Sequence, residues 1–150
     1  MDYGIVIEKI HQELKAYWGK GKVADYIPAL AEVEPKRYGI AIETLDGHSF
    51  QVGDADIRFS IQSISKVFAL AMVTRHLGDR IWKFVGREPS GNPFNSLVQL
   101  EYEHGIPRNP FINAGALVVT DRLMSLYEQP KDAILQFVRS ICGNDDIYYD

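Results

Sequence analysis

The chain has 150 residues, 46% apolar and 24% charged, which is enough for one domain with a hydrophobic core. Its net charge is −4 and it has no basic stripe, which argues against a nucleic-acid partner. The single cysteine, Cys142, excludes an intrachain disulfide and suits a reducing compartment. No apolar run is long enough to span a bilayer, and the first residues show no secretory signal pattern. We therefore expect a cytoplasmic protein with no membrane partner.

The N-terminal third predicts a helix, a loop and a β-hairpin. Apolar residues recur at three- and four-residue steps between Ile5 and Trp18, which is the spacing of an amphipathic helix. Its expected buried face carries Ile7, Ile10, Leu14 and Tyr17. Val23 to Pro28 is expected to be loop, because a proline disfavours helix at the residue before it. Tyr38 to Thr44 and Ser49 to Val52 predict two strands joined by a turn at Asp46-Gly47.

The rest of the chain predicts helices. Asn113 is a candidate helix cap, because asparagine side chains accept hydrogen bonds from the first N–H groups of a helix. Cys142 is expected to be a buried thiol. The expected segments are a long helix over Ser63 to Leu77, a short helix around Ile81 to Val85, a loop over Glu88 to Pro93, a helix from Ala114 to about Tyr127, and a helix from Pro130 to Cys142. In the helix that starts at Ala114, the apolar side chains available for burial are Leu117, Val118, Leu123 and Leu126. Two strands before segregated helices predict an α+β fold.

Ser63 and Lys66 form the pattern Ser-x-x-Lys at the start of the predicted long helix. Residues three apart share a helix face, so the hydroxyl and the amine are expected side by side. A serine hydroxyl needs an adjacent base to act as a nucleophile. Lysine serves as that base only when its amine is neutral. The apolar run Val67 to Val73 predicts a buried helix that favours the neutral form. With eight serines and eight lysines a chance match is unremarkable, and a Lys66 that reaches solvent is the alternative.

Four segments in order make the pattern more specific. They are GKVADYIPAL (21–30), FSIQSISK (59–66), EPSGNPFNSL (88–97) and NPFINAGALVV (109–119). Together they resemble the serine-dependent, bacterial-type glutaminases over about residues 5 to 150. The resemblance implies a fold similar to the serine β-lactamases and penicillin-binding proteins. Here that fold would comprise an N-terminal helix, a hairpin, the Ser-x-x-Lys helix and part of a helical subdomain. It also implies that residues 1–150 are the N-terminal portion of a single catalytic domain whose C-terminal half is absent.

The same resemblance implies hydrolysis of L-glutamine to L-glutamate and ammonia, with no metal or organic cofactor. Ser63 would be the nucleophile and Lys66 its base, and a γ-glutamyl ester would form on Ser63. Tyr26 would line the site near them, Asn113 would hold the amino-acid end of the substrate, and Gln62 would be a secondary contact. The family also implies a homo-oligomer. The 150-residue chain alone is expected to be inactive, because the remaining substrate contacts lie in the absent half.

Two other functions compete on the residues alone. A β-lactamase or peptidoglycan carboxypeptidase shares the Ser-x-x-Lys pattern, but the chain shows neither a Ser-Asp-Asn nor a Tyr-x-Asn segment downstream. A non-catalytic assembly fragment would oligomerise without binding glutamine. The four histidines are scattered and have no metal-ligand spacing. We therefore expect no metal site, and the prediction of an amidohydrolase rests on the resemblance to the glutaminases.

Overall fold

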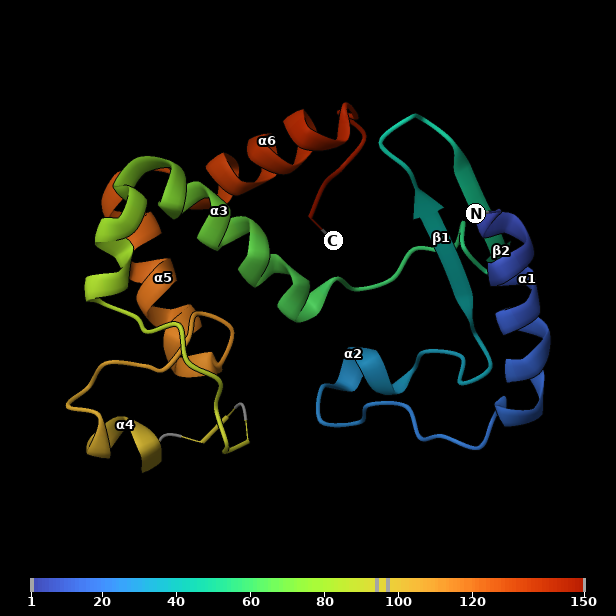
Figure 1. The fold of residues 1–150 in the computed structure, drawn as a ribbon, viewed down its shortest axis with the longest axis horizontal. Helices are drawn as coiled ribbons and strands as arrows, with labels where there is room; N and C mark the ends of the chain where they lie inside the picture. The colour runs from blue at the N-terminus through green and yellow to red at the C-terminus, as the bar shows by residue number, and fades with distance from the viewer. Residues whose placement is uncertain (1, 94, 97, 150) are drawn as a thin grey trace. The chain divides into compact units, whose positions relative to one another are not determined.

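The computed structural model describes residues 2–93, 95–96 and 98–149. The chain forms two compact units, Met1–Phe59 and Ser60–Asp150 (Figure 1). Phe94 and Leu97, which belong to the segment EPSGNPFNSL, lie outside the described residues.

The first unit combines a helix with a β-hairpin. Its elements are the helix α1 (Tyr3–Leu14), the 3-10 turn η1 (Lys15–Tyr17), the short helix α2 (Pro28–Ala31) and the strands β1 (Gly39–Glu43) and β2 (Ser49–Gly53). The strands pair antiparallel with Ile42 opposite Phe50, and Gly47 takes the positive φ of +82° that the turn requires. Helix α1 packs against β2, where the Tyr3 and Phe50 rings meet edge to face at 6.1 Å. The predicted helix and hairpin are confirmed.

The first unit departs from the predictions in two places. The predicted buried face of α1 is wrong in part: Ile7 is buried and Leu14 is half-buried, but Ile10 is 39% exposed and Tyr17 is 64% exposed. The α-helix ends at Leu14 and continues as the 3-10 turn η1, which has three residues per turn and rotates Tyr17 away from the face of Ile7. Helix α2 was not predicted. Pro28 is its first residue, a position where the missing N–H is not needed.

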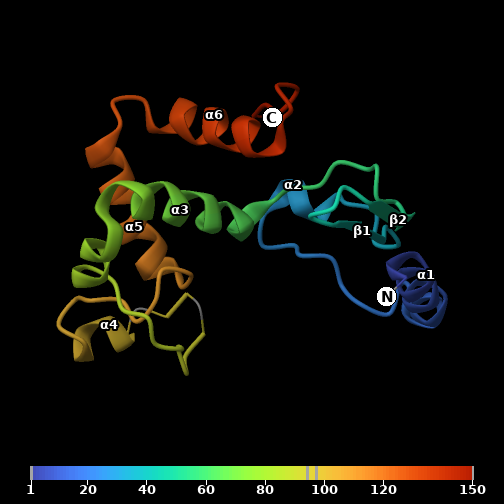
Figure 2. The same cartoon turned by 45° about the horizontal axis from the view of Figure 1, so that its top comes forward.

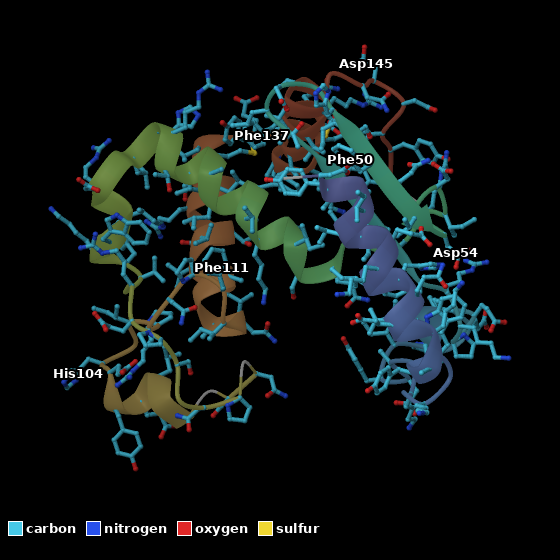
Figure 3. All side chains as sticks on the ribbon, turned by 45° about the vertical axis from the view of Figure 1, so that its right-hand side comes forward. Phe50, Asp54, His104, Phe111, Phe137 and Asp145 are labelled. Atoms are coloured by element: carbon cyan, nitrogen blue, oxygen red, sulfur yellow. The ribbon has the colours of Figure 1, made fainter. Side chains whose placement is uncertain are left out.

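The second unit is helical. Its elements are the 3-10 turn η2 (Gln62–Ile64) and the helix α3 (Ser65–Leu77), then the 3-10 segment η3 (Gly78–Lys83), and finally the helices α4 (Val98–Tyr102), α5 (Asn113–Leu126) and α6 (Pro130–Cys142). Helix α3 contacts both α5 and α6, and the two views in Figures 1 and 2 show it between them. The buried core is Ala69, Met72, Val73, Ile81, Val85, Val119 and Leu123. Phe137 of α6, labelled in Figure 3, packs against this core.

The apolar sequence of α3 predicted a helix buried on every side, and this prediction is wrong. Ala69, Met72 and Val73 face the core, whereas Val67 is 51% exposed. The reason is helical periodicity: α5 and α6 leave one side of α3 uncovered, and Val67 and Ala71, four residues apart, share that exposed side.

Two further expectations in the second unit are wrong. Cys142 is exposed rather than buried. It is the last residue of α6, beside Gly143, whose left-handed conformation (φ +59°) ends the helix at the surface. Leu117 of α5 is 69% exposed, because the core side of α5 carries Val119 and Leu123 instead. Helix α4 was not predicted.

Candidate active site

Ser63 lies in the turn that precedes α3. It is the middle residue of η2 and is exposed, and α3 begins two residues later at Ser65. Gln62, directly before it, has a φ of +43°. This left-handed conformation costs a residue with a Cβ about 1–2 kcal/mol. Backbone strain of this kind clusters at functional sites, so the strain beside Ser63 adds a structural signal to the sequence pattern.

Two oxygen atoms from a distant segment hold the amine of Lys66. Its Nζ donates to the backbone carbonyl of Phe111 at 2.8 Å and to the side-chain Oδ1 of Asn113 at 2.9 Å. Lys66 is half-buried on the first turn of α3, and Asn113 is the first residue of α5. Phe111, which is labelled in Figure 3, lies two residues before the start of α5. The contact therefore joins two segments singled out in the sequence, FSIQSISK and NPFINAGALVV.

This arrangement suits a lysine that accepts a proton. A neutral amine has two N–H donors and one lone pair. Acceptors on Phe111 and Asn113 can occupy both donors, which leaves the lone pair for a hydroxyl group. No hydrogen bond joins Ser63 to Lys66 among the described residues. Residues 63 and 66 are still one turn apart, in η2 and in the first turn of α3. The N–H groups of Ile64 and Ser65 already donate to the Ile61 and Gln62 carbonyls. The Ser63 N–H has no acceptor among the described residues, so it is the candidate donor to an oxyanion.

Asn113 does not cap α5, contrary to the prediction. The cap position is Ile112, and Asn113 follows it inside the helix. Its Oδ1 accepts from Lys66 Nζ instead, and this N–H donor orients the amide with its oxygen toward the amine. Asn113 is exposed, and its amide nitrogen has no partner among the described residues. That nitrogen can donate to a bound carboxylate.

The other predicted site residues lie apart from this contact in the chain. Tyr26 belongs to the first unit, in the bend before α2, and is 73% exposed. Gln62 directly precedes Ser63 in the 3-10 turn η2. One participant was missed by the sequence: the carbonyl of Phe111. A backbone acceptor leaves no signal in residue type, since every residue carries one.

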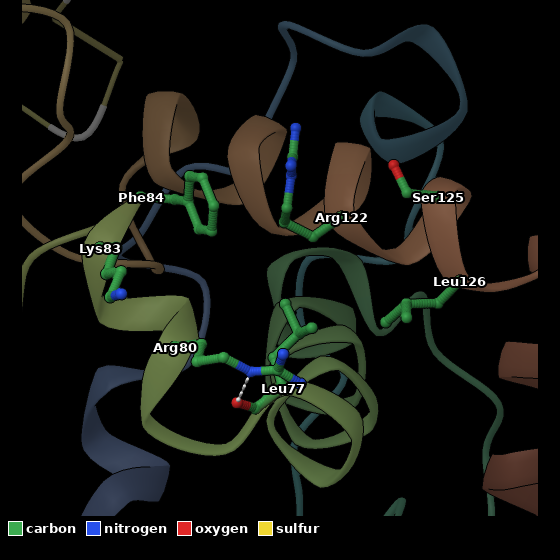
Figure 4. Close-up of a pocket in the computed structure, with 7 residues that line it drawn as sticks. All are labelled: Leu77, Arg80, Lys83, Phe84, Arg122, Ser125 and Leu126. Carbon is green, nitrogen blue, oxygen red and sulfur yellow. Dashed lines mark hydrogen bonds between the residues drawn. The ribbon is translucent and has the colours of Figure 1, made fainter.

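A separate hollow of about 300 Å³ lies at the other end of α3 (Figure 4). It is lined by Leu77, Arg80, Lys83, Phe84, Arg122, Ser125 and Leu126. The Arg80 Nε donates to the Leu77 carbonyl at 3.2 Å, and the Arg122 guanidinium lies 4.8 Å from the centre of the Phe84 ring. Lys66 and Leu77 are eleven residues apart, about 16 Å along a helix, so this hollow is distinct from the candidate active site.

Among the described residues, no three histidine, cysteine or acidic side chains lie close enough together to hold a metal ion. In the same part of the chain, no helix has the length and apolar character needed to cross a membrane.

A family model described as Glutaminase matches residues 21–150, which is most of the chain. The chain belongs to the glutaminase family. Glutaminases of Salmonella arizonae and Salmonella paratyphi B are each 58% identical to it over 146 residues. The match covers 97% of this chain and 47% of each of those glutaminases, so the chain spans about half the length of these relatives.

Solved glutaminase structures share the fold. A probable glutaminase aligns with a TM-score of 0.73 at 35% identity, over 88% of this chain and 45% of that one. The protein Mglu, in its tris and glutamate form, aligns with a TM-score of 0.72 at 37% identity, over 89% of this chain and 30% of that one. The fold is therefore that of the bacterial glutaminases, β-lactamase-like and of α+β class as predicted, and the chain carries part of it.

Proposed function

We propose that the chain carries the reactive half of an enzyme that hydrolyses L-glutamine to L-glutamate and ammonia. The observation that carries the proposal is the Lys66 amine, held at 2.8 and 2.9 Å by two oxygens from the NPFINAGALVV segment. Membership of the glutaminase family supports the substrate, and one neighbour, Mglu, has been solved in a glutamate form.

In the proposed mechanism, the Ser63 hydroxyl attacks the side-chain carboxamide carbon of glutamine while Lys66 takes the hydroxyl proton. The oxyanion accepts a hydrogen bond from the backbone N–H of Ser63. Lys66 returns the proton to the leaving nitrogen, and ammonia departs from a γ-glutamyl ester on Ser63. A water molecule, deprotonated by Lys66, then hydrolyses the ester, and Ser63 regains its proton.

The remaining residues have supporting roles in this proposal. The amide nitrogen of Asn113 donates to the amino-acid end of the substrate, while its oxygen stays on Lys66. Gln62 contacts the substrate beside the nucleophile, and Tyr26 lines the site. We place the enzyme in the cytoplasm as a homo-oligomer. Residues 1–150 form the N-terminal portion of one catalytic domain, so the chain alone has no turnover.

The test is a chimera of residues 1–150 joined to the remaining length of the Salmonella arizonae glutaminase, assayed by ammonia release from L-glutamine. Ser63→Ala and Lys66→Ala should each lower kcat by more than about a thousandfold, as expected when a covalent nucleophile or its base is removed. Ser60→Ala and Lys9→Ala are matched controls at exposed positions and should keep normal turnover. Normal turnover by either site variant would refute the assignment. Labelling of Ser63 by a fluorescent penicillin would favour the carboxypeptidase alternative.

A further inference from the structure

We propose that Asn109 is a positioning residue for the candidate base Lys66. This inference rests on the function proposed above, because it concerns how the base is held. Asn109 does not contact Lys66. Its side chain binds the backbone segment whose Phe111 carbonyl accepts a hydrogen bond from Lys66. The link between the two residues is a single peptide group.

The peptide group that joins Phe111 to Ile112 is the link. Its carbonyl accepts from Lys66 Nζ at 2.8 Å, and its N–H, which belongs to Ile112, donates to the Asn109 Oδ1 at 3.1 Å. In a trans peptide the carbonyl and the N–H lie in one rigid plane and point in opposite directions. A bond at the N–H therefore fixes the direction of the carbonyl. The Asn109 Oδ1 binds the N–H edge of this peptide plane, and the Lys66 amine binds its carbonyl edge.

Two more bonds fix Asn109 itself. Its Oδ1 also accepts from the Phe111 N–H at 3.0 Å, and its Nδ2 donates to the Glu88 carbonyl at 3.0 Å. The segment around Glu88 is in turn paired with the chain before Asn109, since the Glu88 N–H donates to the Arg108 carbonyl at 2.9 Å. The half-buried Asn109 side chain thus ties the turn before α5 to a second, backbone-paired segment.

Close packing fixes the position of the second Lys66 acceptor, the Asn113 Oδ1, relative to Asn109. A Cβ placed on Gly115 would lie 1.8 Å from the Asn109 carbonyl oxygen, so only glycine lets the first turn of α5 approach this turn. Asn113 lies in that first turn and supplies Oδ1 to Lys66. Both acceptors of the amine are therefore placed relative to Asn109, one through the peptide plane and one through the packing at Gly115.

Two substitutions separate positioning from a merely structural role. Asn109→Ala removes every side-chain bond of the residue. Asn109→Asp keeps an oxygen for the Phe111 and Ile112 N–H groups but loses the donor to the Glu88 carbonyl, and its charge is tolerated near the N-terminus of α5. Asn144→Ala is the matched control, because it deletes a similar asparagine oxygen bond, to the Asp146 N–H at 2.8 Å, beyond the end of α6.

In the chimera described above, Asn109→Ala should lower kcat about tenfold, the effect of losing one or two hydrogen bonds in the reactive geometry. KM should change less than about twofold, since Asn109 is not expected to touch the substrate. Asn109→Asp should keep more than about a third of wild-type kcat. An unchanged kcat in Asn109→Ala, or equal losses in both variants, would overturn the proposal, because equal losses assign the effect to the Glu88 tether.

A second measurement does not depend on turnover. In the 150-residue chain, the rate at which an N-hydroxysuccinimide ester acylates Lys66 is followed by peptide mass spectrometry. Asn109→Ala should raise that rate about fivefold over wild type, and Asn144→Ala should leave it unchanged. An unchanged rate in Asn109→Ala would reject positioning. If Lys66→Ala instead retains full turnover in the chimera, the proposed function fails while the labelling result stands, so the two failures can be told apart.

Discussion

Replacement of Gly115 by alanine tests the packing that brings α5 to the turn before it. The new Cβ would lie 1.8 Å from the Asn109 carbonyl oxygen and 2.9 Å from the Pro110 Cα. Both atoms are backbone, so no side-chain rotation relieves the collision. Overpacking of this kind costs about 1–3 kcal/mol, and a backbone clash of this depth belongs at the upper end. Alanine recovers about 1 kcal/mol through its higher helix propensity. The net loss is then about 2 kcal/mol.

The assay is thermal unfolding of the chain followed by far-ultraviolet circular dichroism. For a unit of this size a loss of about 2 kcal/mol lowers Tm by roughly 10 °C. Gly91→Ala is the matched control in the same unit, because a Cβ there has no atom within 4 Å and the backbone needs no positive φ. That control should leave Tm unchanged or slightly raised. A Gly115→Ala chain that unfolds at the same temperature as Gly91→Ala would refute the packing argument.

Two further predictions concern α6. Burial, together with the nearby Asp132 carboxylate, raises the pKa of Tyr149, whose hydroxyl donates to the Lys131 carbonyl at 2.6 Å. When the pKa of a group is higher in the folded state than in the unfolded state, the group stabilises the fold at low pH. This stabilisation is complete below the unfolded-state pKa of tyrosine, near 10, and is lost as pH rises through the folded-state pKa. Tyr149→Phe should therefore reduce the loss of stability above pH 10, measured by urea unfolding, and an unchanged pH dependence would contradict it. Cys142 is exposed, so the folded chain should react fully with Ellman's reagent before any unfolding. Reaction only in denaturant would favour the buried thiol expected from the sequence.

Much of the fold could be predicted because its signals are local. The hairpin turn follows from Gly47, and α6 begins at Pro130 and stops before Gly143, as the sequence indicates. Helices α2 and α4 were missed because four- and five-residue helices carry too little periodicity to detect. Burial was predicted less well. Whether Leu117 or Val119 faces inward depends on which side of α5 meets α3, and that is a property of the packed unit.

The sequence by itself determined the family and the α+β class and singled out Ser63 and Lys66 as the candidate pair, because each depends on residue types at short spacings. Only the tertiary structure decided what holds the lysine. Its acceptors lie 45 and 47 residues further along the chain, and one of them is a backbone carbonyl. A hydrogen bond depends on direction as well as on atom type. The direction of the Phe111 carbonyl is set by a peptide plane that no residue letter encodes.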